Sequence, residues 1–83
     1  MIYLTRREAG APRLGILISR KHSAKATVRN HIKRCIREGF RLEHVALQAS
    51  LGAMDVLVRP PYGARPGPAM LERVRTVLRE LKA

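Results

Sequence analysis

Basic side chains gather in the first half of the sequence. Eight Lys or Arg residues and a single acid, Glu38, lie from Arg20 to Arg41. Within this run, cations recur every fourth residue at positions 25, 29, 33, 37 and 41. In a helix this spacing places like charges on successive turns, where each pair is repelled by about a few tenths of a kcal/mol. Phosphate groups offset that cost, because they bind Lys and Arg and release counterions. The pattern therefore predicts a surface that binds nucleic acid.

The composition of the whole chain agrees with this prediction. Its 83 residues carry a net charge of +11, and the sequence pI is about 11.5, above the roughly 9 that is typical of nucleic-acid-binding domains. The length predicts one small domain over residues 1–83, without a large enclosed active-site cavity. The single cysteine, Cys35, permits neither an intrachain disulfide nor a thiolate zinc site. We expect a cytoplasmic protein with no membrane partner, because no secretory signal or membrane-spanning apolar run is found.

A long helix must position these cations. From about Lys25 to Ala49 there is no proline, and apolar residues follow a helical period. At about 100° per residue, one arc of this helix is suited to packing and the opposite arc is cationic. The packing arc holds Val28, Ile32, Cys35, Ile36 and Gly39. The cationic arc holds Asn30, Lys33, Arg34, Arg37 and Arg41. We expect Cys35 to be a buried core residue and Glu38 to pair locally with arginines.

Strands and a second helix complete the predicted fold. Residues 1–7 and 13–20 form two apolar-rich runs that a turn-like linker separates, which predicts a β-hairpin, and residues 54–59 form a third strand. Prolines make residues 60–68 a loop, and an amphipathic helix begins near Pro68. The fold class is therefore α+β, with a small sheet of three to four strands against a long basic helix and a C-terminal amphipathic helix.

Charge alone leaves several classes of function open. It does not distinguish RNA from DNA, and it does not exclude a general RNA- or ribosome-binding module. A protein-only nuclease needs clustered acids or a His pair, which the sequence lacks. His22, His31 and His44 show no metal-ligand spacing, so no protein-bound metal is expected. A membrane-active helix is disfavoured because no Trp anchors it.

Two segments carry a resemblance to a known family. RLGILISRK at residues 13–21 and VRNHIKRCIREGFR at residues 28–41 resemble the signature of the bacterial ribonuclease P protein subunit. That signature is an R-x-G-x-x-x-S-[RK]-K strand followed by an R-N-R-x-K-R-x-x-R-E-x-F-R helix. The resemblance implies a left-handed crossover between the last two strands, whereas roughly 98% of parallel crossovers are right-handed.

The family resemblance also implies a function and its partners. In this family the RNA subunit holds Mg²⁺ and removes the 5′ leader of precursor tRNA, while the protein binds both RNAs. The protein would supply no catalytic side chain and bind no cofactor alone, and we expect it to be monomeric when free. Arg29, Asn30, Lys33 and Arg34 stand at the motif positions that the resemblance implies face the RNA subunit, and Lys21, Arg37 and Arg41 would extend that surface. With the other residues of the basic run, the predicted RNA-binding set is Arg20, Lys21, Lys25, Arg29, Asn30, His31, Lys33, Arg34, Arg37 and Arg41. The candidates for a cleft that binds the leader are Tyr3, Leu17, Ser19 and Leu57.

Two departures from the family pattern are visible. His31 stands where the family usually has Arg, which replaces a permanently charged fork with an imidazole. Family members also usually begin with a helix that helps line the leader cleft, and this sequence begins inside the predicted sheet. We expect weaker leader binding as a result.

Overall fold

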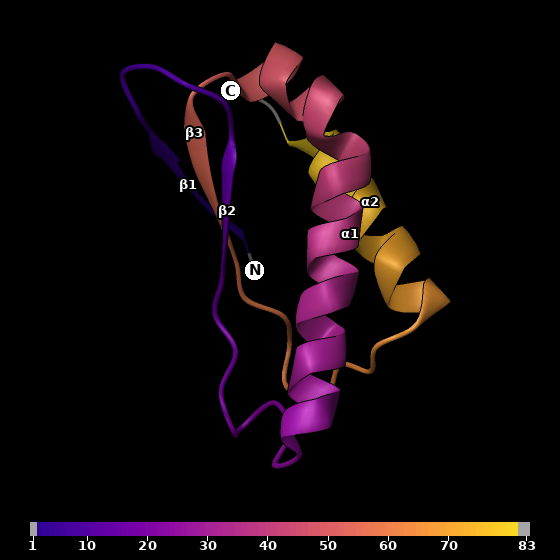
Figure 1. The fold of residues 1–83 in the computed structure, drawn as a ribbon. Coiled ribbons are helices and arrows are strands. Elements are labelled where there is room, and N and C mark those ends of the chain that lie inside the picture. Colours follow the sequence, from indigo (N-terminus) through magenta and orange to yellow (C-terminus); the bar gives the residue numbers. More distant parts are fainter. Residues whose placement is uncertain (1, 82–83) are drawn as a thin grey trace.

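The structure is a computed structural model that describes residues 2–81. Its elements, in chain order, are β1 (Ile2–Arg6), β2 (Arg13–Ile16), α1 (Ala26–Leu51), β3 (Met54–Val58) and α2 (Pro68–Glu80). The strands form one mixed sheet, and both helices lie on the same side of it and pack against each other (Figure 1). The predicted α+β class, the long central helix and the C-terminal helix are confirmed.

The predicted hairpin between the first two strands is wrong. The strand order is β1-β3-β2, with β3 antiparallel to β1 and parallel to β2. Strand β3 is therefore the central strand, and its inward-facing residues Met54, Val56 and Val58 are at most 7% exposed. Residues 7–12 cross the end of β3 between its two neighbours, and the Arg7 N–H donates to the Ala53 carbonyl at 2.7 Å.

Strand β2 is shorter than the sequence predicts. It ends at Ile16, and the Leu17 N–H makes one further bond to the Val58 carbonyl at 2.9 Å. Beyond that point the partner strand runs into Pro60 and Pro61, which have no N–H to donate to a ladder. The chain from Leu17 onward therefore leaves the sheet and turns toward α1. The left-handed sense of the crossover through α1 stays a prediction.

The core lies between the sheet and the two helices. Ile32, Ile36 and Leu47 of α1 meet Val56 of β3 and Leu78 of α2, and each of these side chains is at most 2% exposed. The predicted packing arc of α1 is confirmed at Ile32 and Ile36. Cys35 is only half-buried, because it lies at the margin of the α2 contact with its Sγ 3.9 Å from the Gly67 carbonyl oxygen. The expectation of a fully buried cysteine is corrected accordingly.

Gly39 allows α1 and α2 to approach closely. A Cβ at this position would lie 2.7 Å from Cγ1 of Val74, a branched side chain that cannot swing aside. Ala favours a helix over Gly by about 1 kcal/mol, but overpacking costs about 1–3 kcal/mol.

We therefore expect Gly39→Ala to lower the free energy of unfolding by about 1 kcal/mol in urea titrations, because the overpacking cost exceeds the gain in helix propensity. In a Val74→Ala background the same change should become stabilising. A stabilising effect of Gly39→Ala in the otherwise unchanged chain would contradict this packing account.

Candidate nucleic-acid interface

The predicted cationic side of α1 is exposed. Because Ile32 and Ile36 turn inward, the opposite side of the helix faces away from both the sheet and α2. Its exposed members are called the α1 polar face here, and they are Asn30, His31, Arg34, Arg37 and Arg41. Within residues 2–81, Arg34 and Arg37 form no ion pair and no side-chain hydrogen bond. Their guanidinium groups are therefore available to an external anion.

Two predicted members lie toward the margin of this surface. Arg29 and Lys33 are half-buried. The Nη1 of Arg29 donates to the Ser23 carbonyl at 2.8 Å and to the Ala24 carbonyl at 3.1 Å. This side chain therefore ties the preceding turn to the first turn of α1. It has a structural role that the motif did not indicate.

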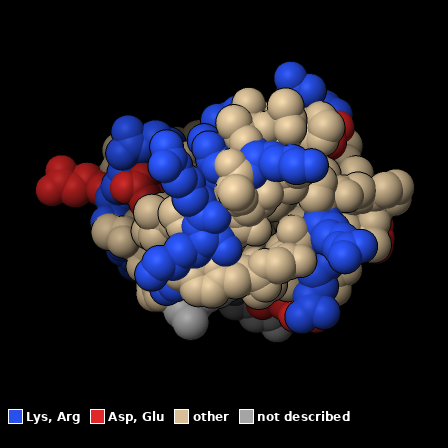
Figure 2. Space-filling view, turned by 90° about the horizontal axis from the view of Figure 1, so that it is seen from below, with Lys and Arg blue, Asp and Glu red and all other residues tan. Residues whose placement is uncertain are grey.

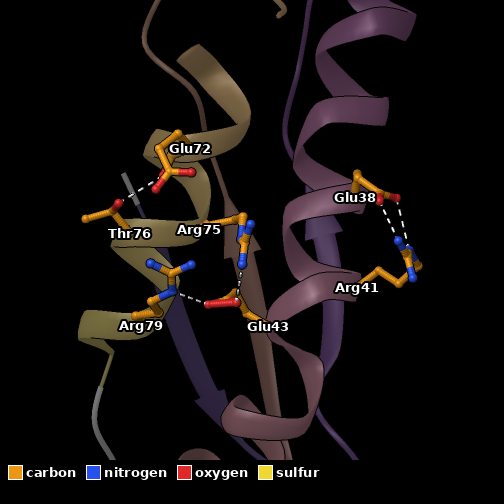
Figure 3. Close-up of polar contacts among 7 residues, drawn as sticks. All are labelled: Glu38, Arg41, Glu43, Glu72, Arg75, Thr76 and Arg79. Carbon is orange, nitrogen blue, oxygen red and sulfur yellow. Dashed lines mark hydrogen bonds and ion pairs between the residues drawn. The ribbon is translucent and has the colours of Figure 1, made fainter. Parts of the chain in front are cut away.

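Arg41 is partly neutralised by a neighbour. Its Nε donates to Oε2 of Glu38 at 3.0 Å, and a second bond joins its Nη2 to Oε1 (Figure 3). This hydrogen bond is the main reason that the pKa of Glu38 is lowered and the pKa of Arg41 is raised. The expected local pairing of Glu38 is confirmed, and Arg34 and Arg37 remain as the unpaired cations of the face among the described residues.

A second basic region lies at the end of the molecule where α1 begins. Arg20, Lys21 and Lys25 are exposed on the turn that leads into α1, and Arg65 is exposed on the loop between β3 and α2. Figure 2 looks at this end and shows several groups of blue side chains with tan surface between them. The sequence motif did not include Arg65, because its loop lies far from the motif along the chain.

The outer face of the sheet brings together only part of the predicted leader cleft. Tyr3 is opposite Leu57, which is in turn opposite Gly15. These residues line an open hollow of about 520 Å³. Leu17 is exposed beyond the end of β2, and Ser19 lies in the following turn, so neither lines the hollow. The floor is thus partly apolar with one aromatic ring at its edge.

Asp55 was not singled out by the sequence reasoning. Its Oδ1 lies 2.8 Å from Nε of Arg7 and 3.1 Å from Nε of Arg13. Two arginines from neighbouring segments thus hold the ends of β1 and β2 to β3. The signal was present in the alternation of β3, where Asp55 shares the outward side with Leu57.

Glu43 was also missed. It is 7% exposed, and its carboxylate accepts a bond from Nε of Arg79 and lies 3.6 Å from Nη2 of Arg75 (Figure 3). Both arginines come from α2, so this cluster joins the two helices across the molecule from the α1 polar face. The sequence does carry an indication of this cluster. Glu43 falls at a core position of α1, and Arg75 and Arg79 are four residues apart on α2.

The described residues offer neither a metal site nor a membrane-spanning helix. No group of three or more His, Cys, Asp or Glu within residues 2–81 is placed to hold a metal ion. In the same part of the chain, neither helix has the length and apolar character needed to cross a membrane.

Comparison with known proteins gives consistent matches. The family model described as Ribonuclease P matches residues 1–82. The Ribonuclease P protein component of Methylococcus capsulatus is 53% identical over 47 residues, which cover 57% of this chain and 34% of that protein. The Ribonuclease P protein component of Idiomarina loihiensis is 43% identical over 59 residues, which cover 71% of this chain and 44% of that protein.

A solved structure agrees with the sequence matches. The RNase P protein from Thermotoga maritima superposes with a TM-score of 0.67 at 26% identity, covering 98% of this chain and 78% of that one. The three-stranded mixed sheet and two helices thus match the fold of that protein. The chain aligns with less than half the length of the curated relatives described above.

Proposed function

The chain belongs to the Ribonuclease P protein family, and from this we propose that it acts as the protein subunit of ribonuclease P. In this role it binds the RNA subunit and the 5′ leader of precursor tRNA and promotes removal of the leader. The observation that carries the proposal is the α1 polar face, where Arg34 and Arg37 are exposed and unpaired within residues 2–81.

The α1 polar face would act by positioning and charge. One arginine guanidinium can donate two hydrogen bonds to two oxygens of a phosphate, and a rigid helix holds successive guanidinium groups at fixed spacing. The RNA subunit and the precursor tRNA are both polyanions that repel each other, and a chain of net charge +11 reduces this repulsion. In this proposal Mg²⁺ is held by the RNA subunit and supplies the chemistry of cleavage. The protein contributes binding and no catalytic side chain.

The outer sheet face would receive the unpaired leader. The ring of Tyr3 offers a stacking surface for a base, and Leu57 offers apolar contact beside it. Single-stranded RNA suits such a face, because its bases are free to stack on side chains. Binding of the leader in this hollow adds to the RNA affinity that the α1 polar face provides.

A cleavage assay tests the proposed function. At a magnesium concentration too low for the RNA alone, adding the chain to a bacterial ribonuclease P RNA should raise the rate of precursor tRNA cleavage, because the protein supplies the missing cationic charge. The chain with magnesium but without RNA should give no cleavage. Equal binding to unrelated RNAs without any rise in rate would instead support a general RNA- or ribosome-binding module.

His31 gives a prediction about the family motif. His31→Arg should tighten binding to ribonuclease P RNA at pH 8 and steepen the dependence of log K on log salt by about 0.9, because it adds one permanent phosphate contact. The measurement is a salt titration of RNA affinity, with His31→Gln as the uncharged control. If Arg and Gln gave the same slope, position 31 would not face a phosphate.

A further inference from the structure

We infer that His22 is a positioning residue that joins the Arg20–Lys21 turn to the loop after β3. The role concerns binding of phosphates by that turn, and so it rests on the proposed function. His22 lies outside the family motif as quoted above, and its side chain is only 8% exposed although its neighbours Arg20 and Lys21 are exposed. A buried imidazole in an exposed basic turn needs a structural reason.

The His22 ring closes the turn on itself. The Ser19 N–H donates to Nδ1 of His22 at 3.0 Å, and the His22 N–H donates to the Ser19 carbonyl at 2.9 Å. A third bond runs from the Lys21 N–H to Oγ of Ser19 at 3.3 Å. These bonds fix the backbone on both sides of Arg20 and Lys21, so the two side chains leave the turn toward solvent.

The same ring reaches a segment 38 residues away. Because Nδ1 accepts a bond, the ring proton is on Nε2, which donates to the Pro60 carbonyl at 2.8 Å. The ring also packs edge-on against Tyr62, with 4.7 Å between ring centroids. Only a side chain that accepts at one end and donates at the other can make both connections.

The loop after β3 is itself held by an arginine. Nη2 of Arg59 donates to the Tyr62 hydroxyl at 2.7 Å, and Cζ of Arg59 lies 5.4 Å from the Tyr62 ring centroid. His22, Tyr62 and Arg59 thus form one connected cluster between two loops. This cluster holds the exposed cations of the turn beside the loop that carries Arg65, at the end of the molecule shown in Figure 2. Loss of the cluster would leave those cations in place on the chain but without a fixed position.

Two substitutions separate the two bonds of the ring. In His22→Asn, the amide oxygen lies near the position of Nδ1 and can accept from Ser19, but the side chain is too short to reach Pro60. In His22→Gln, the amide nitrogen lies near the position of Nε2 and can still donate to Pro60. Binding to a bacterial ribonuclease P RNA is measured for both variants, alone and in an Arg20→Ala, Lys21→Ala background.

His22→Asn should weaken RNA binding about fivefold, because two cations must then be ordered on binding. His22→Gln should restore most of the affinity, and neither change should have a further effect in the background without Arg20 and Lys21. A variant that loses the fold altogether would instead lose affinity in both backgrounds. An equal loss with and without Arg20 and Lys21 therefore indicates a general structural defect. Wild-type affinity for His22→Asn, or the same fivefold loss in both backgrounds, would overturn the inference.

A spectroscopic measurement is independent of RNA. The long-range ¹H–¹⁵N spectrum of the His22 ring in the free protein should show the proton on Nε2 and not on Nδ1. A proton on Nδ1 would contradict the two hydrogen bonds by which His22 joins the turn to the loop after β3. If the wild-type chain failed to bind ribonuclease P RNA, the proposed function would fail together with the RNA role of His22, whereas normal wild-type binding with additive losses would remove only the inference.

Discussion

Replacing Arg34 and Arg37 together with Ala is expected to weaken binding to ribonuclease P RNA about 30-fold at physiological salt, since each exposed charge-assisted contact contributes about 1 kcal/mol. The slope of log K against log salt should fall by about two, because each lost phosphate contact removes about 0.9. The fold should be unaffected, because both side chains are exposed and neither makes an ion pair or side-chain hydrogen bond within residues 2–81. Filter binding over a salt series measures both quantities.

A matched control removes the same charge elsewhere. Arg6 lies on β1 and Arg73 on α2, and both are exposed. Replacing this pair with Ala leaves the same net charge as the α1 variant but an intact α1 polar face. If the two double variants lost the same affinity, binding would depend on total charge and the α1 polar face would have no special role.

The second large effect concerns stability. Glu43→Ala should lower the free energy of unfolding by about 2 kcal/mol, and the midpoint of thermal unfolding by about 10 °C, because it leaves two arginines without their buried partner. The full cost of breaking a buried pair is not expected, since the side chains of Arg75 and Arg79 are 31% and 47% exposed. Chemical and thermal unfolding followed by circular dichroism measure the change.

Glu38 provides the comparison for Glu43. It also pairs with an arginine on a helix, but its pair with Arg41 lies at the surface, where ion pairs contribute little. The free energy of unfolding and the thermal midpoint of the Glu38→Ala variant should therefore be close to those of the wild type. Equal destabilisation by the two substitutions would show that burial of Glu43 between the helices is not what makes its pairs important.

Local periodicity predicted the helices well. The arc that holds Ile32 and Ile36 follows from spacing within one segment, and both side chains are buried as predicted. The alternation of the apolar residues Met54, Val56 and Val58 in the sequence likewise matches the side of β3 that packs inward. These features depend on residues close together along the chain, which a sequence shows directly.

Strand pairing could not be predicted in the same way. Alternation shows which side of a strand is buried, but it does not identify the neighbouring strand. The linker at residues 8–12 predicts a hairpin turn, whereas in the structure residues 7–12 cross the end of β3. In the structure β3 lies between β1 and β2, and Asp55 pairs with Arg7 and Arg13 from the two neighbouring segments.

The same distinction between local spacing and distant contacts applies to the candidate interface. Exposure of Arg34 and Arg37 follows from the helical period and is confirmed, whereas their role in RNA binding stays a prediction. The half-buried position of Arg29 depends on carbonyls of the preceding turn, and the role of His22 depends on Pro60, which lies 38 residues away. Such contacts join segments whose proximity the sequence does not reveal.

The central claim is that the α1 polar face lies against ribonuclease P RNA. A hydroxyl-radical probe on a single cysteine tests it, after Cys35→Ser removes the native thiol. Positions 26 and 48 are exposed on the same side of α1 as Arg37 and leave every cation in place, while position 76 is exposed on α2. The account predicts that probes at 26 and 48 cut the RNA at discrete sites and that a probe at 76 does not. Cutting from 76 with none from 26 and 48 would contradict it.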